Sequence, residues 1–133
     1  MKKIIISTLI LFLGFSIFAQ DNVKLRVGQT MSDIQKVFPE LKAKVDSDGD
    51  TYLFQDLPAV QIYYYFDSKK ICHAQIYIQG IENTSVLLKT LNTSEYIKLS
   101  AKEYLRVDGD TVLKFIIDVS VEHGVIMLSV IRQ

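Results

Sequence analysis

The stretch VQIYYYFDSKKICHAQIYI, residues 60–78, holds two apolar runs separated by the polar residues 67–70. Successive side chains of a β-strand point to opposite faces of the sheet, so apolar residues at every second position indicate a strand with one buried face. These residues are Val60, Ile62, Tyr64 and Phe66 in the first run, and Cys72, Ala74, Ile76 and Ile78 in the second. Two such runs joined by a short polar connection predict an antiparallel β-hairpin.

The register of this hairpin follows if both apolar sets lie on the same face, because directly opposite residues point to the same side. Phe66 then faces Cys72 rather than Ile71, and the connection between the strands has an odd number of residues. A slip by one residue would mix the two faces. The same register predicts three further pairs on the other face: Tyr65 with His73, Tyr63 with Gln75, and Gln61 with Tyr77.

Two short helices are indicated, one before and one after the hairpin. Thr30 suits the N-cap of a helix over residues 31–38, and Pro39 discourages its continuation. A second helix is expected over residues 84–92. Strand-like runs cover residues 51–54, 60–66, 71–78, 96–107, 111–119 and 125–131. The order helix, three strands, helix, three strands predicts an α+β fold, an antiparallel sheet with two short helices on one face.

A short turn sequence occurs twice. DGDTYL at residues 48–53 is matched by DGDTVL at residues 108–113 in five of six positions. Each copy precedes a strand-like run, so we interpret the match as a sign of internal duplication, a tandem αβββ repeat over residues 24–80 and 81–133. The alternative is the chance recurrence of turn residues before two strands.

The N-terminus has the pattern of a secretory signal peptide. Lys2 and Lys3 precede an uncharged stretch, residues 4–18, that is rich in Ile, Leu and Phe, and Ala19 suits the position before the cleavage site. The alternative, an uncleaved membrane anchor, needs about 20 apolar residues, and this run is shorter. We therefore expect a signal peptide over residues 1–19, a single domain over residues 20–133 with no membrane span after cleavage, and a secreted or periplasmic product.

Charge and cysteine content narrow the classes of partner. Loss of Lys2 and Lys3 with the leader would leave 13 basic against 15 acidic side chains, which gives no electrostatic case for binding nucleic acid. Cys72 is the single cysteine of the sequence, so the chain forms no internal disulfide. It lies in an apolar run, which is typical of a buried cysteine that acts as a small hydrophobe.

The main functional expectation is a tyrosine-rich open face of the sheet. In the strand expected over residues 96–107, Ile97, Leu99, Ala101 and Leu105 would face inward. If this strand and the hairpin belong to one sheet, the open face carries the candidate protein-binding residues Tyr63, Tyr65, His73, Tyr77, Tyr96 and Tyr104. Tyrosine is enriched in protein interfaces. The alternative is an ordinary solvated sheet face, because strand propensity alone also favours tyrosine.

The sequence shows no constellation typical of catalysis. His73 adjoins Cys72, but neighbouring residues of a strand point to opposite faces, so the two side chains do not form a nucleophile pair. Asp46, Asp48 and Asp50 resemble the start of a calcium loop. The glycine and glutamate positions of an EF-hand are not matched, so a hairpin turn is the better account and a looser calcium contact the alternative. We expect a non-enzymatic domain with no catalytic residues, no cofactor and no metal.

Residues 27–39, VGQTMSDIQKVFP, resemble the opening of the repeat in β-lactamase-inhibitor-like proteins. They are similar also to the opening of the small outer-membrane assembly factors of the BamE (SmpA/OmlA) type. The resemblance implies a short amphipathic helix followed by a sheet and, for the inhibitors, two such units in tandem that bind a partner through the sheet face. This chain departs from the assembly factors by lacking a lipid-bearing cysteine, and from the inhibitors by lacking disulfides.

We therefore expect an exported, non-enzymatic domain that binds another envelope or extracellular protein through its tyrosine-rich sheet face, in an inhibitor or immunity-type role. The alternative is a small-ligand or envelope-lipid binding protein with a pocket between sheet and helices. A hydrolase with an unrecognised site is a third interpretation. An apolar cavity of roughly 300 Å3 or more under the helices would favour the ligand binder. A filled core beside an open tyrosine face would favour the protein binder.

Overall fold

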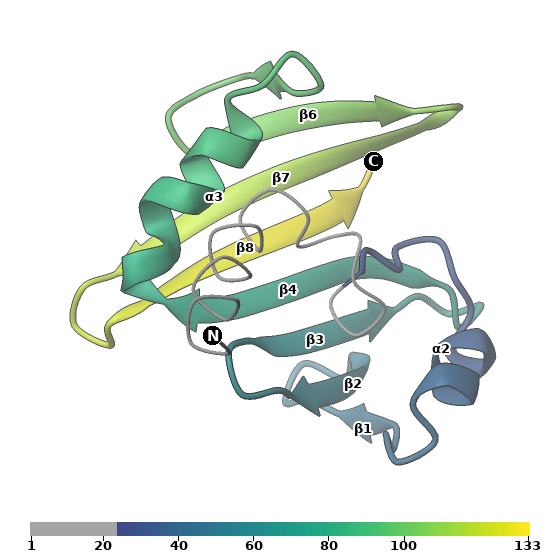
Figure 1. The fold of residues 1–133 in the computed structure, drawn as a ribbon. Helices are drawn as coiled ribbons and strands as arrows, with labels where there is room; N and C mark the ends of the chain where they lie inside the picture. Colours follow the sequence, from purple (N-terminus) through teal and green to yellow (C-terminus); the bar gives the residue numbers. More distant parts are fainter. Residues whose placement is uncertain (1–23) are drawn as a thin grey trace, which may run out of the picture.

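The computed structural model describes residues 24–133 (Figure 1). The expected signal peptide, residues 1–19, lies outside the described residues. The elements are α2 (Met31–Val37), β1 (Lys44–Val45), β2 (Thr51–Asp56), β3 (Gln61–Phe66), β4 (Cys72–Gly80), the 3-10 helix η1 (Ile81–Asn83), α3 (Thr84–Leu91), β5 (Ile97–Lys98), β6 (Glu103–Asp108), β7 (Thr111–Ser120) and β8 (Val125–Arg132).

Eight strands form one antiparallel sheet in the order β1-β2-β3-β4-β8-β7-β6-β5. The chain therefore builds two four-stranded halves, and it joins them where β4 pairs with β8. Helix α3 leads from β4 toward the far edge of the sheet and crosses one face of the second half (Figure 1). The expected α+β class with an antiparallel sheet is confirmed, and strands dominate it.

Both helices contribute to one hydrophobic core. Ile34 of α2 and Leu87 and Leu91 of α3 belong to the same cluster of buried side chains, which also includes the inward residues of the strands. Helix α2 begins as the sequence predicts, because the hydroxyl oxygen of Thr30 accepts the backbone N–H of Asp33 at 3.1 Å. One side of the sheet is thus packed against helices and the incoming chain, and the other side is left to solvent among the described residues.

Strand β4 carries a bulge that the alternating pattern does not predict. Phe66 lies opposite Cys72, as expected, but Tyr65 lies opposite Ala74. His73 is therefore an extra residue, and beyond it the side chains of β4 are shifted by one position relative to β3. The three further pairs expected from the sequence are wrong: the structure pairs Tyr65 with Ala74, Tyr63 with Ile76, and Gln61 with Ile78.

The bulge turns Gln75 and Tyr77 into the core, where they are 0% and 1% exposed. Ile76 and Ile78 lie instead on the half-exposed side of the sheet, together with Tyr63. The expectation that Tyr77 lies on the open face is wrong, because one extra residue reverses the alternation of a strand from that point on.

The strand expected before β7 is in fact a hairpin of two strands. β5 pairs with β6, and the backbone N–H of Leu99 donates to the carbonyl of Glu103 at 2.9 Å to close the turn. The break ends the predicted alternation: Tyr96 and Tyr104 are 9% and 1% exposed, whereas Ile97 is 56% exposed. The expected outward position of Tyr96 and Tyr104 is wrong, because the alternation of one continuous strand does not carry through a turn.

Each half of the chain has the same order of elements, a helix, a two-residue strand and three longer strands. The two matching turn sequences nevertheless lie at different places in the halves, since Gly49 stands between β1 and β2 and Gly109 between β6 and β7. Both glycines have a positive φ, 86° and 62°, a region that glycine adopts at little cost. Local turn geometry therefore accounts for the recurrence, and the match does not support a duplication.

Cys72 is fully buried. Its thiol donates to the carbonyl oxygen of Ala74 at 3.4 Å. Burial raises the pKa of the Cys72 thiol to about 12, so the thiol is protonated at neutral pH and is a poor nucleophile. The side chain therefore behaves as the small buried hydrophobe that the sequence predicts.

We predict that Tyr77→Ala destabilises the protein far more than Tyr63→Ala. Tyr77 is 1% exposed, so loss of its ring should lower the free energy of unfolding by about 3–5 kcal/mol. Tyr63 lies on the half-exposed side, where loss of its ring contacts should cost about 1 kcal/mol. Urea denaturation of the two variants measures the difference. Equal losses would place both rings in the same environment and contradict the described register.

Candidate protein-binding face

Four aromatic side chains meet on the side of the sheet that faces away from the helices. Tyr52 and Phe54 come from β2, and Tyr63 and Tyr65 come from β3. Ring centroids are 4.7 Å apart for Phe54 and Tyr63, 5.5 Å for Tyr52 and Tyr65, and 6.3 Å for Tyr63 and Tyr65. All four are half-buried. Rings at these separations stabilise one another, and we call this group the aromatic face.

The aromatic face continues as an aliphatic surface across the middle of the sheet. Directly opposite residues share a side, so the register extends the row of Tyr63 through Ile76 and Ser129 to Ile116. A neighbouring row runs from Tyr65 through Ala74 and Ile131. The two helices bury their apolar residues in the core on the other side of the sheet, so neither helix covers this surface.

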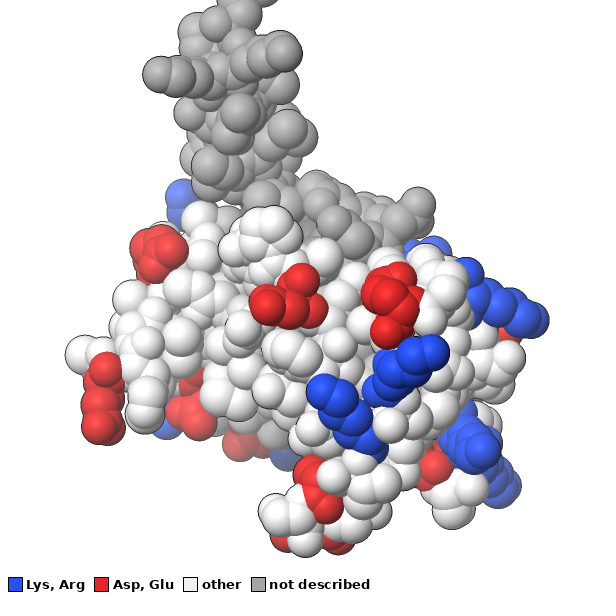
Figure 2. All heavy atoms as spheres, turned by 90° about the horizontal axis from the view of Figure 1, so that it is seen from below, with Lys and Arg blue, Asp and Glu red and all other residues white. Residues whose placement is uncertain are grey.

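Figure 2 views the molecule from below, toward the edge that β1 forms, with charged side chains coloured. Lysine and arginine gather on the side where α2 lies, and acidic side chains are spread over the rest of this view with broad uncharged areas between them. In the first half of the sheet, which contains the aromatic face, positive charge is therefore concentrated at the end next to α2, and negative charge is more widely spread.

The structure places two of the six predicted binding residues, Tyr63 and Tyr65, on the aromatic face. His73 lies in the bulge of β4 and is half-buried. Tyr77, Tyr96 and Tyr104 are buried on the opposite side of the sheet and cannot contact a partner on the aromatic face. The six predicted binding residues therefore do not form one surface. The bulge in β4 turns Tyr77 into the core, and the β5–β6 turn does the same for Tyr96 and Tyr104.

Tyr52 and Phe54 were missed as members of this surface. The sequence contains the signal that identifies them, since they alternate with the fully buried Leu53 in a short strand next to β3. Opposite residues of neighbouring strands share a side, so Tyr52 accompanies Tyr65, and Phe54 accompanies Tyr63. Once β2 and β3 are paired, the complete aromatic face follows from the sequence.

The three aspartates of the β1–β2 turn lie together at the edge of the aromatic face. Carboxylate oxygens of Asp46, Asp48 and Asp50 lie within 4.8 Å of one another. One carboxylate oxygen of Asp46 accepts the backbone N–H groups of Asp48 at 3.0 Å and Asp50 at 2.9 Å. These bonds are those of an aspartate-stabilised turn, so turn geometry accounts for the cluster without a metal.

A buried glutamine attaches the first described residues to the sheet. The side-chain oxygen of Gln75 accepts the backbone N–H of Arg26 at 2.7 Å. Its amide nitrogen donates to the carbonyl of Lys24 at 3.2 Å and to the hydroxyl of Tyr77 at 2.8 Å. Buried polar groups are costly unless they are hydrogen-bonded, and here the glutamine is bonded at both ends of its amide.

Arg26 and Tyr64 extend this polar interior. The guanidinium of Arg26 lies 5.1 Å from the ring centroid of Phe38, and the side chain is 3% exposed. Tyr64 donates its hydroxyl hydrogen to the side-chain oxygen of Gln55 at 2.6 Å. Burial raises the pKa of Tyr64, and the nearby charge of Arg26 opposes that rise. This network holds the core together and contains no nucleophile activated by a base.

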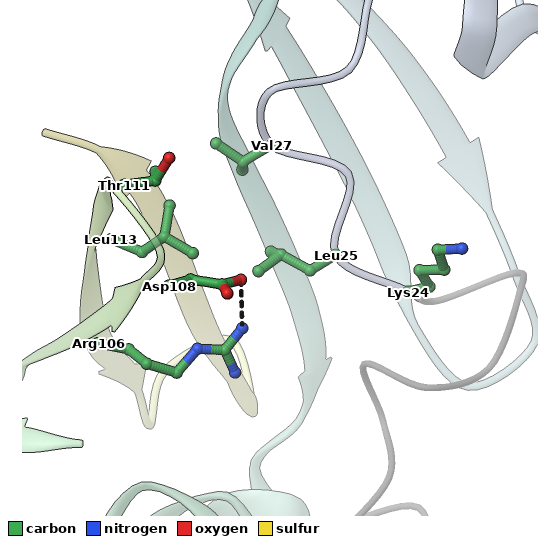
Figure 3. Close-up of a pocket in the computed structure, with 7 residues that line it drawn as sticks. All are labelled: Lys24, Leu25, Val27, Arg106, Asp108, Thr111 and Leu113. Carbon is green, nitrogen blue, oxygen red and sulfur yellow. Dashed lines mark ion pairs between the residues drawn. The ribbon is translucent and has the colours of Figure 1, made fainter. Parts of the chain in front are cut away.

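A cleft of about 470 Å3 opens between the first described residues and the β6–β7 hairpin (Figure 3). Its walls mix aliphatic and charged groups, and it does not lie beneath a helix. In Figure 3, Leu25 and Val27 point toward Leu113, whereas the side chain of Lys24 points away from Arg106. This cleft is therefore not the apolar cavity under the helices that a ligand binder predicts. The lining residues are Lys24, Leu25, Val27, Arg106, Asp108, Thr111 and Leu113.

Arg106 is held by contacts within the protein. Its guanidinium lies 5.7 Å from the ring centroid of Tyr96 and 5.8 Å from that of Phe115, and it donates to the Tyr96 hydroxyl at 3.3 Å. A carboxylate oxygen of Asp108 lies 3.8 Å from the other terminal nitrogen. Contacts within the protein therefore partly neutralise the positive charge of Arg106.

One serine and one histidine lie close together in the β7–β8 turn. The hydroxyl oxygen of Ser120 is 2.9 Å from Nδ1 of His123 and also accepts the backbone N–H of His123 at 3.3 Å. His123 is exposed, and no carboxylate orients its ring among the hydrogen bonds and ion pairs of residues 24–133. The contact between Ser120 and His123 is therefore explained by the geometry of the β7–β8 turn.

Comparisons with protein-family models, with curated proteins and with solved structures return no match for this chain. Within residues 24–133, neither α2 nor α3 has the length and apolar character needed to cross a membrane. The candidate function therefore depends on the geometry of this chain alone, and the aromatic face is its most distinctive exposed feature.

We predict that Gln75→Leu lowers the free energy of unfolding by about 2–4 kcal/mol, because it leaves buried partners of the amide without their hydrogen bonds. The backbone N–H of Arg26 should also exchange with solvent faster. Gln61→Leu is the matched control, since Gln61 is exposed, and it should change stability by no more than about 0.5 kcal/mol. Urea denaturation and amide hydrogen exchange measure both effects. A Gln75→Leu variant as stable as the control would contradict the anchoring role of the glutamine.

Proposed function

We propose that this chain is an exported, non-enzymatic domain that binds another protein through the aromatic face, in an inhibitor or immunity-type role. The observation that carries the proposal is the packed, half-exposed group of Tyr52, Phe54, Tyr63 and Tyr65 on a sheet surface that no helix covers among residues 24–133. The partner is a protein of the cell envelope or the extracellular space.

An ordinary solvated sheet face carries polar residues at its outward positions. Here most outward positions of β3, β4 and β8 are aromatic or aliphatic, as in the row from Phe54 through Tyr63 and Ile76. Gln61 and Ser129 are the polar exceptions in these three strands. Extended exposed apolar surfaces of this kind mark interaction sites. Tyrosine supplies a large contact area together with a hydroxyl that remains able to form hydrogen bonds when the ring is covered.

The rings also hold one another in place. Each ring of the aromatic face has a neighbour within 5.7 Å between centroids. Side chains that are already ordered lose little conformational entropy when a partner covers them, which favours binding. The equal order of elements in the two halves supports the further proposal that the fold is a tandem repeat, as in the inhibitors that residues 27–39 resemble.

We predict that the double variant Tyr63→Thr/Tyr65→Thr loses capture of the partner while it keeps the fold. Threonine retains the strand preference of these positions but removes both rings. Immobilised wild type and variant are compared for the proteins that they retain from an envelope and culture extract, with quantification by mass spectrometry. Val121→Thr is the matched control, because Val121 is 81% exposed in the β7–β8 turn and lies away from the aromatic face.

The expected result is a set of proteins retained by wild type and by Val121→Thr but lost from the double variant. The melting temperature of the double variant should fall by no more than about 10 °C, since each half-exposed ring contributes about 1 kcal/mol. Equal retention by all three proteins would contradict binding through the aromatic face. A collapse of thermal stability would show instead that the two rings serve the core.

A further inference from the structure

The open side of the sheet carries an excess of carboxylates near the aromatic face. The register places Asp56 of β2 and Asp118 of β7 on this side. The β1–β2 turn adds Asp46 and Asp50, and the negative charges of both act on the phenol of Tyr65. Asp46 and Asp50 lie beside the aromatic face, and Asp56 lies at the other end of β2. Asp118 lies farther away, since β4 and β8 separate β7 from β3.

Within the strands of this side, two lysines accompany these carboxylates. Lys114 lies on the same side, but its ammonium nitrogen is 2.6 Å from a carboxylate oxygen of Glu103, and the two charges cancel. Lys44, opposite Tyr52, is the remaining lysine that the register places on this side, and no ion pair involves it among residues 24–133. The strand residues of this side are therefore aromatic, aliphatic and net acidic. The β3–β4 turn, at the same end of the sheet as the β1–β2 turn, adds the exposed Lys69 and Lys70 together with Asp67. The acidic character beside Tyr65 comes from Asp46 and Asp50, whose charges act on its phenol.

Such a surface has a specific chemical preference. The face of a tyrosine ring is negative, so it attracts a Lys or Arg cation by about 0.5–1 kcal/mol at an exposed site and by more where water is excluded. Carboxylates within reach add charge-assisted hydrogen bonds, which an arginine makes best. Tyr52, Tyr63 and Tyr65 lie within 6.3 Å of one another between ring centroids, so their rings form one aromatic surface that an incoming cation can contact.

We propose that the partner protein presents an arginine or lysine among apolar residues, and that its cation rests on the rings of Tyr63 and Tyr65 beside Asp46 and Asp50. The apolar neighbours of that cation cover Ile76 and the adjoining aliphatic surface. This inference rests on the proposed function, and it adds the chemistry of the partner. A second copy of the chain would bring two acidic faces together, and an anionic membrane would be repelled, so charge complementarity favours a cationic protein surface.

The test uses a synthetic probe, acetyl-Gly-Leu-Arg-Leu-Arg-Leu-Gly-amide, together with two analogues in which citrulline or glutamate replaces arginine. Citrulline has the shape of arginine without its charge. Binding is measured by nuclear magnetic resonance from the shifts of the tyrosine ring signals of the mature protein. The arginine peptide should shift the rings of Tyr63 and Tyr65 and bind about tenfold more tightly than the citrulline peptide. The glutamate peptide should bind more weakly still.

Two variants locate the carboxylates. Asp46→Asn with Asp50→Asn keeps a side-chain oxygen at position 46 for the turn but removes both charges, and it should weaken the arginine peptide about threefold to tenfold. Asp110→Asn is the matched control, because Asp110 is exposed in the β6–β7 turn, and its affinity should equal that of wild type.

Equal affinity of the arginine and citrulline peptides would overturn the inference and leave the proposed function standing, since the face would then bind by apolar contact alone. Absence of ring shifts with the arginine peptide would overturn it as well. So would a dimer through the aromatic face in sedimentation, or co-sedimentation with phosphatidylglycerol vesicles. The capture experiment with the double variant Tyr63→Thr/Tyr65→Thr tests the proposed function separately. The proposed function and the inference about the partner's cation can therefore fail independently.

Discussion

The arrangement of this sheet depends on one extra residue in β4. At the bulge, Phe66 lies opposite Cys72 and Tyr65 lies opposite Ala74, so the inward and outward positions of β4 exchange from His73 onward. A bulge inserts a residue without a partner and changes the direction in which the following side chains point. The bulge therefore determines which side of the sheet each later residue of β4 faces. Because β4 pairs with β8, it also determines which β4 residues lie opposite the inward and outward residues of β8, where the two halves of the sheet meet.

The same constraint determines both the core and the surface. Inside, it buries Gln75, whose amide binds the chain at Lys24 and Arg26 and so closes the core with a segment from the start of the described chain. Outside, it places Ile76 beside Tyr63, where an amide would otherwise stand. The aromatic face is therefore continuous with an aliphatic surface because a glutamine and a tyrosine have been turned inward.

Much of the fold could be predicted from periodicity, and the rest could not for identifiable reasons. Alternation in residues 60–66 and the cap at Thr30 predicted the hairpin and the first helix, and both are confirmed. Alternation of apolar residues shows which residues of a strand share a face, but it does not show whether the pattern continues past a bulge or a turn. Nothing in the residues Cys72 and His73 indicates a bulge.

Tyrosine adds a second ambiguity, since its ring suits a core and its hydroxyl suits a surface. The predicted site therefore included Tyr77 and Tyr104, which are buried, and omitted Tyr52 and Phe54, whose pairing with β3 was not used.

The division of the tyrosines between core and open face can be measured directly by nitration of the folded protein with tetranitromethane, with each site assigned by fragmentation mass spectrometry. The account predicts rapid modification of Tyr63 and Tyr65, with Tyr64 unmodified between them. Tyr64 and Tyr77 are 0% and 1% exposed and their pKa values are raised by burial, so both should react only after unfolding. Modification of Tyr64 or Tyr77 at the rate of Tyr63 in the folded protein would contradict the account.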